Sequence, residues 1–255
     1  LDRKFDKKVL RTKNRPIASG KVSIYLGLFY VIILCLLAFL VLINFNLFTI
    51  LAALVSMPLA FTYPLMKRFT YWPQLFLGIT FNYGLILGWT SINPEINILP
   101  IIFYFGAIFW TLGYDTIYGY QDIKDDEIIG VKSTSIKFKK NPIKFLLMAY
   151  LIFFISVTYI TYNLNFNPMF YLFLLIIFYQ LFFNQIFNFN KDKPKLCLKI
   201  FKSNNILGLL IYLNILIGYF MNFNNLYYLL LIIPFFHLFF YQIINLDIDN
   251  NNSCH

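Results

Sequence analysis

The sequence contains little charge and few of the side chains that most often hold transition metals. Of its 255 residues 13% are charged, and only two are histidine and three cysteine. Cys35, Cys197 and Cys254 lack metal-site or redox spacing, and His237 has no second ligand nearby, so no zinc or thiol site is indicated. Conversely, 60% of the residues are hydrophobic and 21% aromatic, which excludes an ordinary soluble domain. We expect the chain to lie in a lipid bilayer.

Long apolar runs separated by short polar breaks recur along the chain. At 1.5 Å per residue, each run is long enough to cross roughly 30 Å of hydrocarbon as a helix. Backbone groups in lipid must be satisfied within the segment, which favours helices. The sequence therefore predicts an all-α, polytopic transmembrane bundle of about eight spans, at residues 23–43, 47–66, 72–91, 98–118, 145–162, 168–187, 204–221 and 226–244.

Lysine and arginine are absent from every second connection between these runs. All 21 fall in four segments, at residues 1–21, 67–68, 124–144 and 191–202. The intervening loops have none, at residues 44–46, 91–97, 163–167 and 222–225. The alternation follows the positive-inside rule and places the basic segments on the cytoplasmic side, or on the matrix side in an organelle. The formal net charge of +10 therefore indicates anionic membrane lipid and phosphorylated substrates as partners, and no nucleic acid.

Seven of the eleven acidic residues gather in two short stretches, at residues 2–6 and 115–127. Asp115, Asp122 and Asp126 are spaced by seven and four residues, which at 100° per residue predicts one helical face within about 40°. Asp2 and Asp6 have the same i, i+4 spacing at the start of the chain. The stretch with Asp115 lies at the cytoplasmic end of the predicted fourth span, and the charge pattern places Asp2 and Asp6 on the same side of the membrane.

Carboxylates clustered in this way repel one another unless a cation binds between them. Mg²⁺ prefers oxygen ligands and typically bridges one or two carboxylates to phosphate oxygens. Basic residues that could neutralise a phosphorylated group interleave with both stretches: Arg3, Arg11, Arg15, Lys67, Arg68 and Lys132. The pattern is typical of a pyrophosphate site. A solvated acidic loop, the alternative, does not account for the helical spacing or for the second stretch.

These residues resemble the UbiA superfamily of intramembrane aromatic prenyltransferases. Its members have two aspartate-rich motifs, approximately N-D-x-x-D-x-x-x-D and D-x-x-Y-A-x-x-D-x-x-x-D. The segment "DTIYGYQDIKDDE" is similar to the second motif through Asp115, Tyr118, Asp122 and Asp126, with Gly119 where alanine is usual. The segment "GVKS" follows it, as is common in the family.

The start of the chain, "LDRKFD", is similar to the latter half of the first motif, with Asp2 and Asp6 but without the leading Asn-Asp. The segment at residues 62–84 resembles the branch that prenylates 4-hydroxybenzoate. The resemblance covers roughly residues 1–220 and implies a nine-span family core around a central polar site, with two helices before the first motif. We therefore expect residues 1–220 to be an N-terminally truncated prenyltransferase domain, and leave open whether this fragment is active.

Residues 221–255 are expected to form an extra helix and loop. The segment at residues 181–197, "LFFNQIFNFNKDKPKLC", aligns without gaps to "LFFYQIINLDIDNNNSC" at residues 238–254. Residues 221–255 thus resemble a repeat of residues 164–198. A natural duplication and an assembly artefact both remain open.

The resemblance implies an enzyme of ubiquinone biosynthesis that transfers the prenyl group of a polyprenyl diphosphate to 4-hydroxybenzoate, ortho to the hydroxyl, with Mg²⁺. It assigns Asp2, Asp6, Asp122 and Asp126 to the metal and the diphosphate, with Asp115 as a further catalytic ligand or orienting residue. The implied membrane is the bacterial cytoplasmic or the mitochondrial inner membrane, with the acidic motifs on the cytoplasmic or matrix side.

Five further residues are predicted to take part. Arg68 is expected to grip a substrate anion, either the benzoate carboxylate or the diphosphate, and Lys132 and Arg15 to assist with the diphosphate. Asn14 and Tyr118 would orient a carboxylate or cap a helix. Two alternatives remain: a family member with a different aromatic acceptor, and a cation-coupled transporter, although transporter carboxylates tend to lie near the bilayer midplane.

Overall fold

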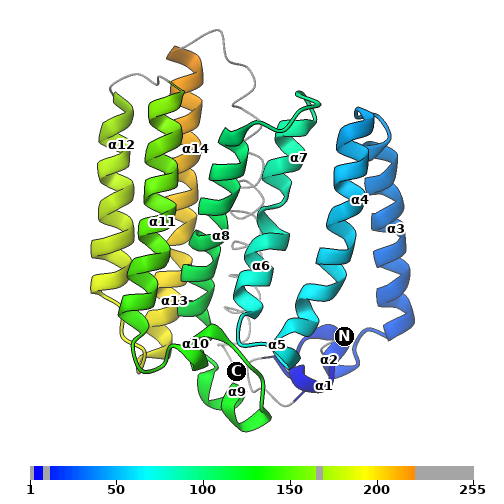
Figure 1. The fold of residues 1–255 in the computed structure, drawn as a ribbon. Coiled ribbons are helices and arrows are strands. Elements are labelled where there is room, and N and C mark those ends of the chain that lie inside the picture. The colour runs from blue at the N-terminus through cyan, green and yellow to red at the C-terminus, as the bar shows by residue number, and fades with distance from the viewer. Residues whose placement is uncertain (1–2, 8–11, 165–168, 222–255) are drawn as a thin grey trace.

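The computed structural model describes residues 3–7, 12–164 and 169–221, and all regular structure in this part of the chain is helical. Most of the long helices lie side by side in one bundle (Figure 1). Five helical segments are long and apolar enough to cross a membrane: Ile24–Leu42, Leu47–Phe69, Ile98–Gly119, Pro142–Asn163 and Pro194–Leu213. The predicted all-α transmembrane bundle is confirmed.

These five segments are built from individual helices as follows. The first, third and fourth are single helices: α3 (Ile24–Leu42), α8 (Ile98–Gly119) and α11 (Pro142–Asn163). The second joins α4 (Leu47–Thr62), η1 (Tyr63–Leu65) and α5 (Met66–Phe69), and the fifth joins α13 (Pro194–Lys202) to the first part of α14 (Asn204–Met221). None of the α3 side chains is buried against the described part of the chain, as expected of a helix that faces lipid.

Two further predicted spans differ from a single long α-helix. Residues 72–91 form two helices, α6 (Pro73–Asn82) and α7 (Gly84–Thr90), which meet at Tyr83. The span at 168–187 continues from α12 (Met169–Phe178) into η2 (Tyr179–Phe187), a π-helix. The span predicted at 226–244, and with it the predicted extra helix and loop, lies outside the described residues.

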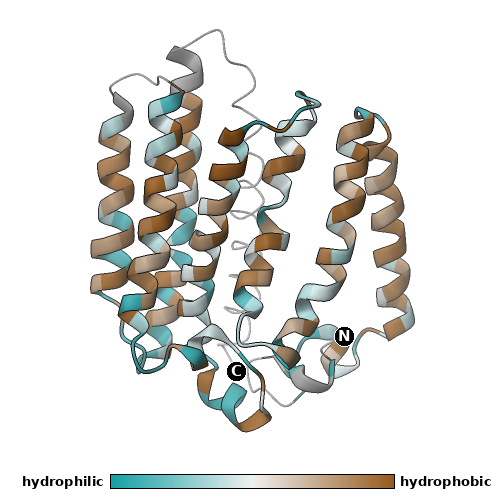
Figure 2. Cartoon of the chain, viewed as in Figure 1, coloured by the Kyte–Doolittle hydropathy of each residue, from teal (hydrophilic) through white to brown (hydrophobic). Residues whose placement is uncertain are grey.

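The basic segments gather at one end of the bundle. Four short helices lie there, together with α5 and α13 (Figure 1): α1 (Arg3–Asp6), α2 (Pro16–Ser19), α9 (Ile123–Ile129) and α10 (Thr134–Lys137). The turn between α3 and α4 and the end of α7 lie at the opposite end (Figure 1). Figure 2 shows hydrophobic residues along most of the bundle and hydrophilic ones concentrated towards the basic end. This arrangement is the one that the distribution of lysine and arginine predicts.

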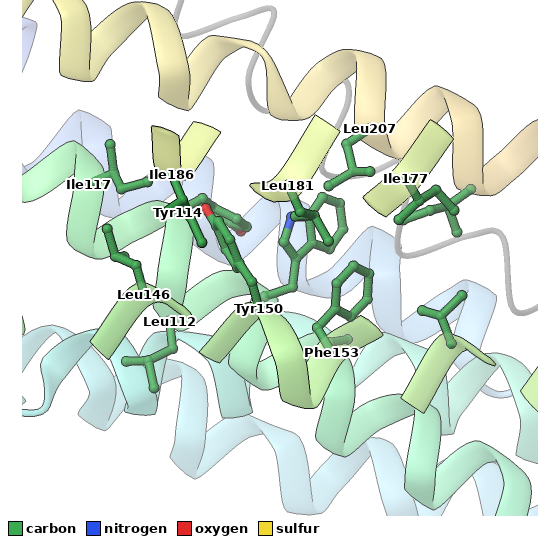
Figure 3. Close-up of a cluster of buried hydrophobic side chains, with 14 of the residues drawn as sticks. Leu112, Tyr114, Ile117, Leu146, Tyr150, Phe153, Ile177, Leu181, Ile186 and Leu207 are labelled. Carbon is green, nitrogen blue, oxygen red and sulfur yellow. The ribbon is translucent and has the colours of Figure 1, made fainter. Parts of the chain in front are cut away.

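Helix α8 packs against both α6 and α11 and forms the centre of the core. Gly106 and Gly113 allow α8 to approach α11 closely, because a Cβ atom at either position would collide with Ser156 or Tyr150 of α11. Trp110 lies between these glycines and stacks on Phe153, with ring centroids 5.1 Å apart. Figure 3 shows α11, η2 and α14 contributing further apolar side chains to this cluster.

A buried polar network links four helices within the same core. Asn204 Oδ1 accepts hydrogen bonds from Trp110 Nε1 at 2.9 Å and from Gln185 Nε2 at 3.0 Å. Gln185 Oε1 in turn accepts from the hydroxyl of Tyr150 at 2.6 Å. The network joins α8, α11, η2 and α14, and so fixes the position of α8 within the bundle.

Candidate functional site: a mixed-charge cavity at the basic end of the bundle

The second acidic stretch lies at the end of α8 and the start of α9. Asp115 and Tyr118 are on the last turns of α8, which ends at Gly119. The chain then turns, and Asp122 is the N-cap residue of α9, which carries Asp126 in its first turn. The prediction of one continuous helical face through Asp115, Asp122 and Asp126 is therefore wrong. The turn nevertheless leaves all three carboxylates on the wall of one cavity.

The segment after α9 is held against the second membrane segment. Helix α9 ends at Gly130, whose φ of +78° lies in the left-handed region that glycine adopts without strain. The backbone N–H of Lys132 donates to the carbonyl oxygen of Lys67 at 2.9 Å. Its side-chain Nζ donates to the carbonyl oxygen of Phe69 at 3.1 Å and lies 5.5 Å from the centroid of the Tyr71 ring. These contacts bring Lys67 and Lys132 to the same part of the site.

Helix α10 is fastened across the end of α8 by buried hydrogen bonds. The Ser135 hydroxyl donates to the carbonyl oxygen of Thr116 at 2.7 Å, and the hydroxyls of Thr116 and Thr134 are 2.6 Å apart. The backbone N–H of Thr134 donates to Gln74 Oε1 of α6 at 2.9 Å. Gly119 makes room for this arrangement, since a Cβ atom there would collide with the Ser135 hydroxyl. The glycine found where the family usually has alanine thus has a local steric reason.

The first acidic stretch reaches the site through Asp6. The carboxylate of Asp6 accepts from Arg15 Nη1 at 3.3 Å, and its carbonyl oxygen accepts from the hydroxyl of Thr12 at 2.9 Å. Asp2, the other predicted ligand from this stretch, lies outside the described residues.

These elements surround a cavity of about 290 Å³, here called the acidic cavity. Seven of the predicted site residues line it: Asp6, Arg15, Asp115, Tyr118, Asp122, Asp126 and Lys132. Arg68 and Asn14 do not. Arg68 is exposed on α5, next to Lys67, which does line the cavity, and Asn14 is exposed in the turn before α2.

Three polar residues of the lining were not among the predicted site residues. Thr12, Gln74 and Ser133 contribute to the wall, and Gln74 is almost completely buried in the first turn of α6. Its Oε1 accepts from Thr134, whereas its Nε2 donates to no acceptor in the described part of the chain. A glutamine in the otherwise apolar first turn of a predicted span indicates a buried polar contact. Residue spacing alone, however, does not connect Gln74 with the distant acidic motifs.

The lining combines charges of both signs. Four carboxylates, from Asp6, Asp115, Asp122 and Asp126, share the cavity with the side chains of Arg15, Lys67 and Lys132. Among the described residues no three histidine, cysteine or acidic side chains converge into a ready-made metal site. A divalent ion that takes one or two carboxylates and completes its coordination with phosphate oxygens and water does not need such convergence. The donor set therefore fits Mg²⁺ bound together with a phosphorylated ligand.

The fold and the cavity define a class of protein: a polytopic helical membrane protein with a cavity lined by charged residues of both signs at the basic end of its bundle. Residues 1–206 match the model of the UbiA prenyltransferase family. The chain belongs to this family.

Curated relatives agree with the family match. The chain is 40% identical over 220 residues to the mitochondrial 4-hydroxybenzoate polyprenyltransferase of Bos taurus, covering 85% of this chain and 58% of the relative. It is 39% identical over 220 residues to the human protein of the same name, with the same coverage. With 4-hydroxybenzoate geranyltransferase 2 of Lithospermum erythrorhizon, identity is 41% over 222 residues, 86% of this chain and 71% of the relative. The chain thus spans somewhat under six tenths of the mammalian relatives. No solved structure matches it.

Proposed function

We propose that the protein of which this chain is part transfers a polyprenyl group from polyprenyl diphosphate to the aromatic ring of 4-hydroxybenzoate. The observation that supports this most strongly is the acidic cavity, in which carboxylates from both acidic stretches share one wall with three cationic side chains. A diphosphate with a divalent cation is the ligand whose charges match such a lining. The names of the relatives, with their shared acceptor, supply the choice of 4-hydroxybenzoate.

The roles in donor binding follow from charge. Asp6, Asp122 and Asp126, with Asp2 from the same stretch as Asp6, would hold Mg²⁺, and Asp115 would be a further ligand or would orient one. When bound, Mg²⁺ neutralises the diphosphate and stabilises the charge that develops on it as it leaves. Arg15, Lys67 and Lys132 place positive charge around the same group.

The reaction balances without a redox cofactor. The allylic C–O bond breaks, and its electron pair leaves with the diphosphate. The ring carbon ortho to the hydroxyl donates a π-electron pair to the allylic carbon, forming the new C–C bond. The proton on that ring carbon then passes to a base in the site, which restores aromaticity. The protein accelerates these steps by holding donor and acceptor in contact and by stabilising the departing anion.

That Arg68 contacts the benzoate carboxylate remains a prediction, and its side chain would do so from the exposed side of α5. Inside the cavity, Lys67 is the neighbouring cation and the better placed partner for an anion. We further propose that the product enters ubiquinone biosynthesis and that the membrane is the bacterial cytoplasmic or the mitochondrial inner membrane, with the acidic cavity on the cytoplasmic or matrix side. The positive-inside rule and the mitochondrial names of the relatives support this assignment.

The test uses membranes from cells that express the full-length gene. Labelled 4-hydroxybenzoate and polyprenyl diphosphate are supplied with and without Mg²⁺, and label in the lipid fraction is measured. We expect metal-dependent incorporation that falls at least a hundredfold in an Asp122→Asn, Asp126→Asn variant, on the order of the loss when electrostatic stabilisation of a transition state is removed.

The matched control is Asp125→Asn, Glu127→Gln, which removes the same charge from the same short helix at residues outside the cavity lining. It should retain most of the activity. Equal loss in both variants would show a general charge effect. A well-expressed protein that gives no product would refute prenyl transfer to 4-hydroxybenzoate. The next experiments would then test other aromatic acceptors and measure cation transport.

A further inference from the structure

A second cavity, of about 570 Å³, lies between η2, α13 and the start of α14. It shares no lining residue with the acidic cavity. We call it the lysine cavity, and it is lined by Asn184, Asn188, Leu196, Lys199, Ile200, Lys202, Ser203 and Ile206. Nothing in the proposed prenyl transfer uses these residues.

The charged groups of the lysine cavity are all positive. Lys199 and Lys202 are three residues apart on α13 and therefore on the same side of the helix. Neither forms an ion pair with a carboxylate in the described part of the chain. The side-chain amide of Asn184 donates to Gln180 Oε1 at 2.8 Å. The side-chain amide of Asn188 donates to the backbone carbonyl oxygen of Asn184 at 3.1 Å. The two ammonium groups are thus the charged donors of the cavity, and they suit an anion.

Three residues of the lining are apolar, and apolar surface continues from them onto the outside of the bundle. Leu196, Ile200 and Ile206 contribute the apolar wall. Ile206 is 57% exposed, and one turn further along α14 Leu209 is 45% exposed. A small hydrophilic anion would gain nothing from this surface, whereas an acyl chain would bury it.

The position of the cavity in the bundle agrees with this chemistry. Helix α13 lies at the basic end (Figure 1) and begins the membrane-crossing segment Pro194–Leu213. The lysines are therefore near the level of the lipid headgroups, and Ile206 and Leu209 lie further along the segment, towards the hydrocarbon. We propose that the lysine cavity binds an anionic phospholipid, with the headgroup phosphate at Lys199 and Lys202 and the acyl chains along α14.

This site is independent of the proposed enzymatic activity, so its test measures binding alone. The full chain is purified in a non-ionic detergent, stripped of lipid and titrated with phosphatidylglycerol or phosphatidylcholine, and bound lipid is counted by native mass spectrometry. We expect the anionic lipid to bind first. A Lys199→Gln, Lys202→Gln variant should weaken it about thirtyfold, from about 1 kcal/mol for each lysine beside an anionic headgroup.

The matched control removes the same charge from the same region. Lys193 and Lys195 are exposed at the start of α13 and do not line the cavity, so Lys193→Gln, Lys195→Gln should leave affinity within about threefold. Equal weakening by both double variants would refute a defined site. The Lys199→Arg, Lys202→Arg variant keeps the charge and should keep binding, which covers the case in which the glutamine variant fails to fold.

A separate arm distinguishes lipid from free phosphate. Excess inorganic phosphate should displace little phosphatidylglycerol, and Ile206→Gln, which leaves both lysines in place, should weaken the lipid severalfold. Efficient displacement by phosphate, together with an unaffected Ile206→Gln variant, would show a small-anion site and overturn the lipid proposal. Equal affinity for phosphatidylcholine would overturn it as well.

Discussion

Replacing Asn204 by leucine should destabilise the bundle much more than the same replacement at Asn205. Asn204 Oδ1 accepts from Trp110 Nε1 and Gln185 Nε2, and leucine would leave both buried donors without an acceptor. Asn205 Oδ1 is buried with no hydrogen-bond partner in the described part of the chain. The two substitutions are chemically identical and adjacent in α14, so each is a control for the other.

The expected magnitude follows from the two hydrogen bonds that Asn204 accepts from other helices. The two that its Nδ2 donates to the carbonyl oxygens of Ile200 and Phe201 are also lost, but they lie within the same membrane-crossing segment. Hydrogen bonds between helices in membrane proteins contribute about 0.6 to 1.7 kcal/mol each, and a buried unpaired donor costs about 1 to 3 kcal/mol. Asn204→Leu should therefore lower the free energy of unfolding by about 2 to 4 kcal/mol. Asn205→Leu removes an unsatisfied acceptor and should be neutral or stabilising by up to about 1 kcal/mol.

The assay is thermal unfolding of the purified chain in detergent, followed by helical circular dichroism and by loss of the monodisperse species. For a chain of this size, about 2 to 4 kcal/mol corresponds to a midpoint lower by roughly 5 to 15 °C. A double variant with Gln185→Leu should be less destabilised than the sum of the single variants, because both disrupt one network. An Asn204→Leu midpoint equal to that of the unmodified chain would refute the view that this network holds the four helices together.

Two further predictions concern the acidic cavity. Gly119→Ala should lower the free energy of unfolding by about 1 to 3 kcal/mol in the same assay, because the new methyl group displaces the Ser135 hydroxyl from the Thr116 carbonyl oxygen. In a Ser135→Ala background the destabilisation by Gly119→Ala should be about half as large. An equal destabilisation in both backgrounds would refute the steric explanation. Gln74→Glu keeps an acceptor for the Thr134 N–H, so the unfolding midpoint should stay within a few degrees of that of the unmodified protein. It also replaces the Nε2 donor by a negatively charged oxygen, so KM for the prenyl diphosphate should rise about tenfold or more. Gln74→Leu should lower both stability and activity, and equal KM values for the glutamate variant and the unmodified protein would exclude a contact of Gln74 with the substrate.

The parts of the fold that depend on length and apolarity could be predicted from sequence. Residues 98–118 were predicted as a span, and α8 extends over Ile98–Gly119. The break at Tyr83 could not be predicted in this way. Asn82 is buried there and donates to the carbonyl oxygens of Gly78 and Ala107 and to the hydroxyl of Thr111, contacts that depend on the neighbouring α8. Hydropathy reports how much of a segment is apolar, and it carries no information about a tertiary partner.

The composition of the acidic cavity was predictable for a different reason. Asp115, Asp122 and Asp126 were selected because they recur at helical spacing, and they do share the cavity, although a turn at the end of α8 replaces the continuous helix. The backbone N–H groups of Tyr120 and Gln121 close the turn by donating to the carbonyl oxygens of Ile117 and Tyr118. The hydrogen bonds of Thr116 with Thr134 and Ser135 then hold α10 across the end of α8, and these join segments too distant in sequence for a periodicity argument. Spacing thus grouped three residues that do share a cavity, although the continuous helix expected between them is absent.

The two cavities differ in the sign of the charges that line them, which is why we assign them different anions. Both lie at the basic end of the bundle and both contain lysine, but four carboxylates line the acidic cavity whereas the lysine cavity has none. A bare anion would be repelled by the carboxylates of the first, so we propose that this cavity takes a polyanion together with a divalent cation. For the second we propose an anion without a metal, because its charged residues are lysines and apolar surface lies beside them. Chelation of divalent metal should therefore abolish diphosphate binding and leave phosphatidylglycerol binding unchanged, and a parallel loss of both would refute the assignment of different anions to the two sites.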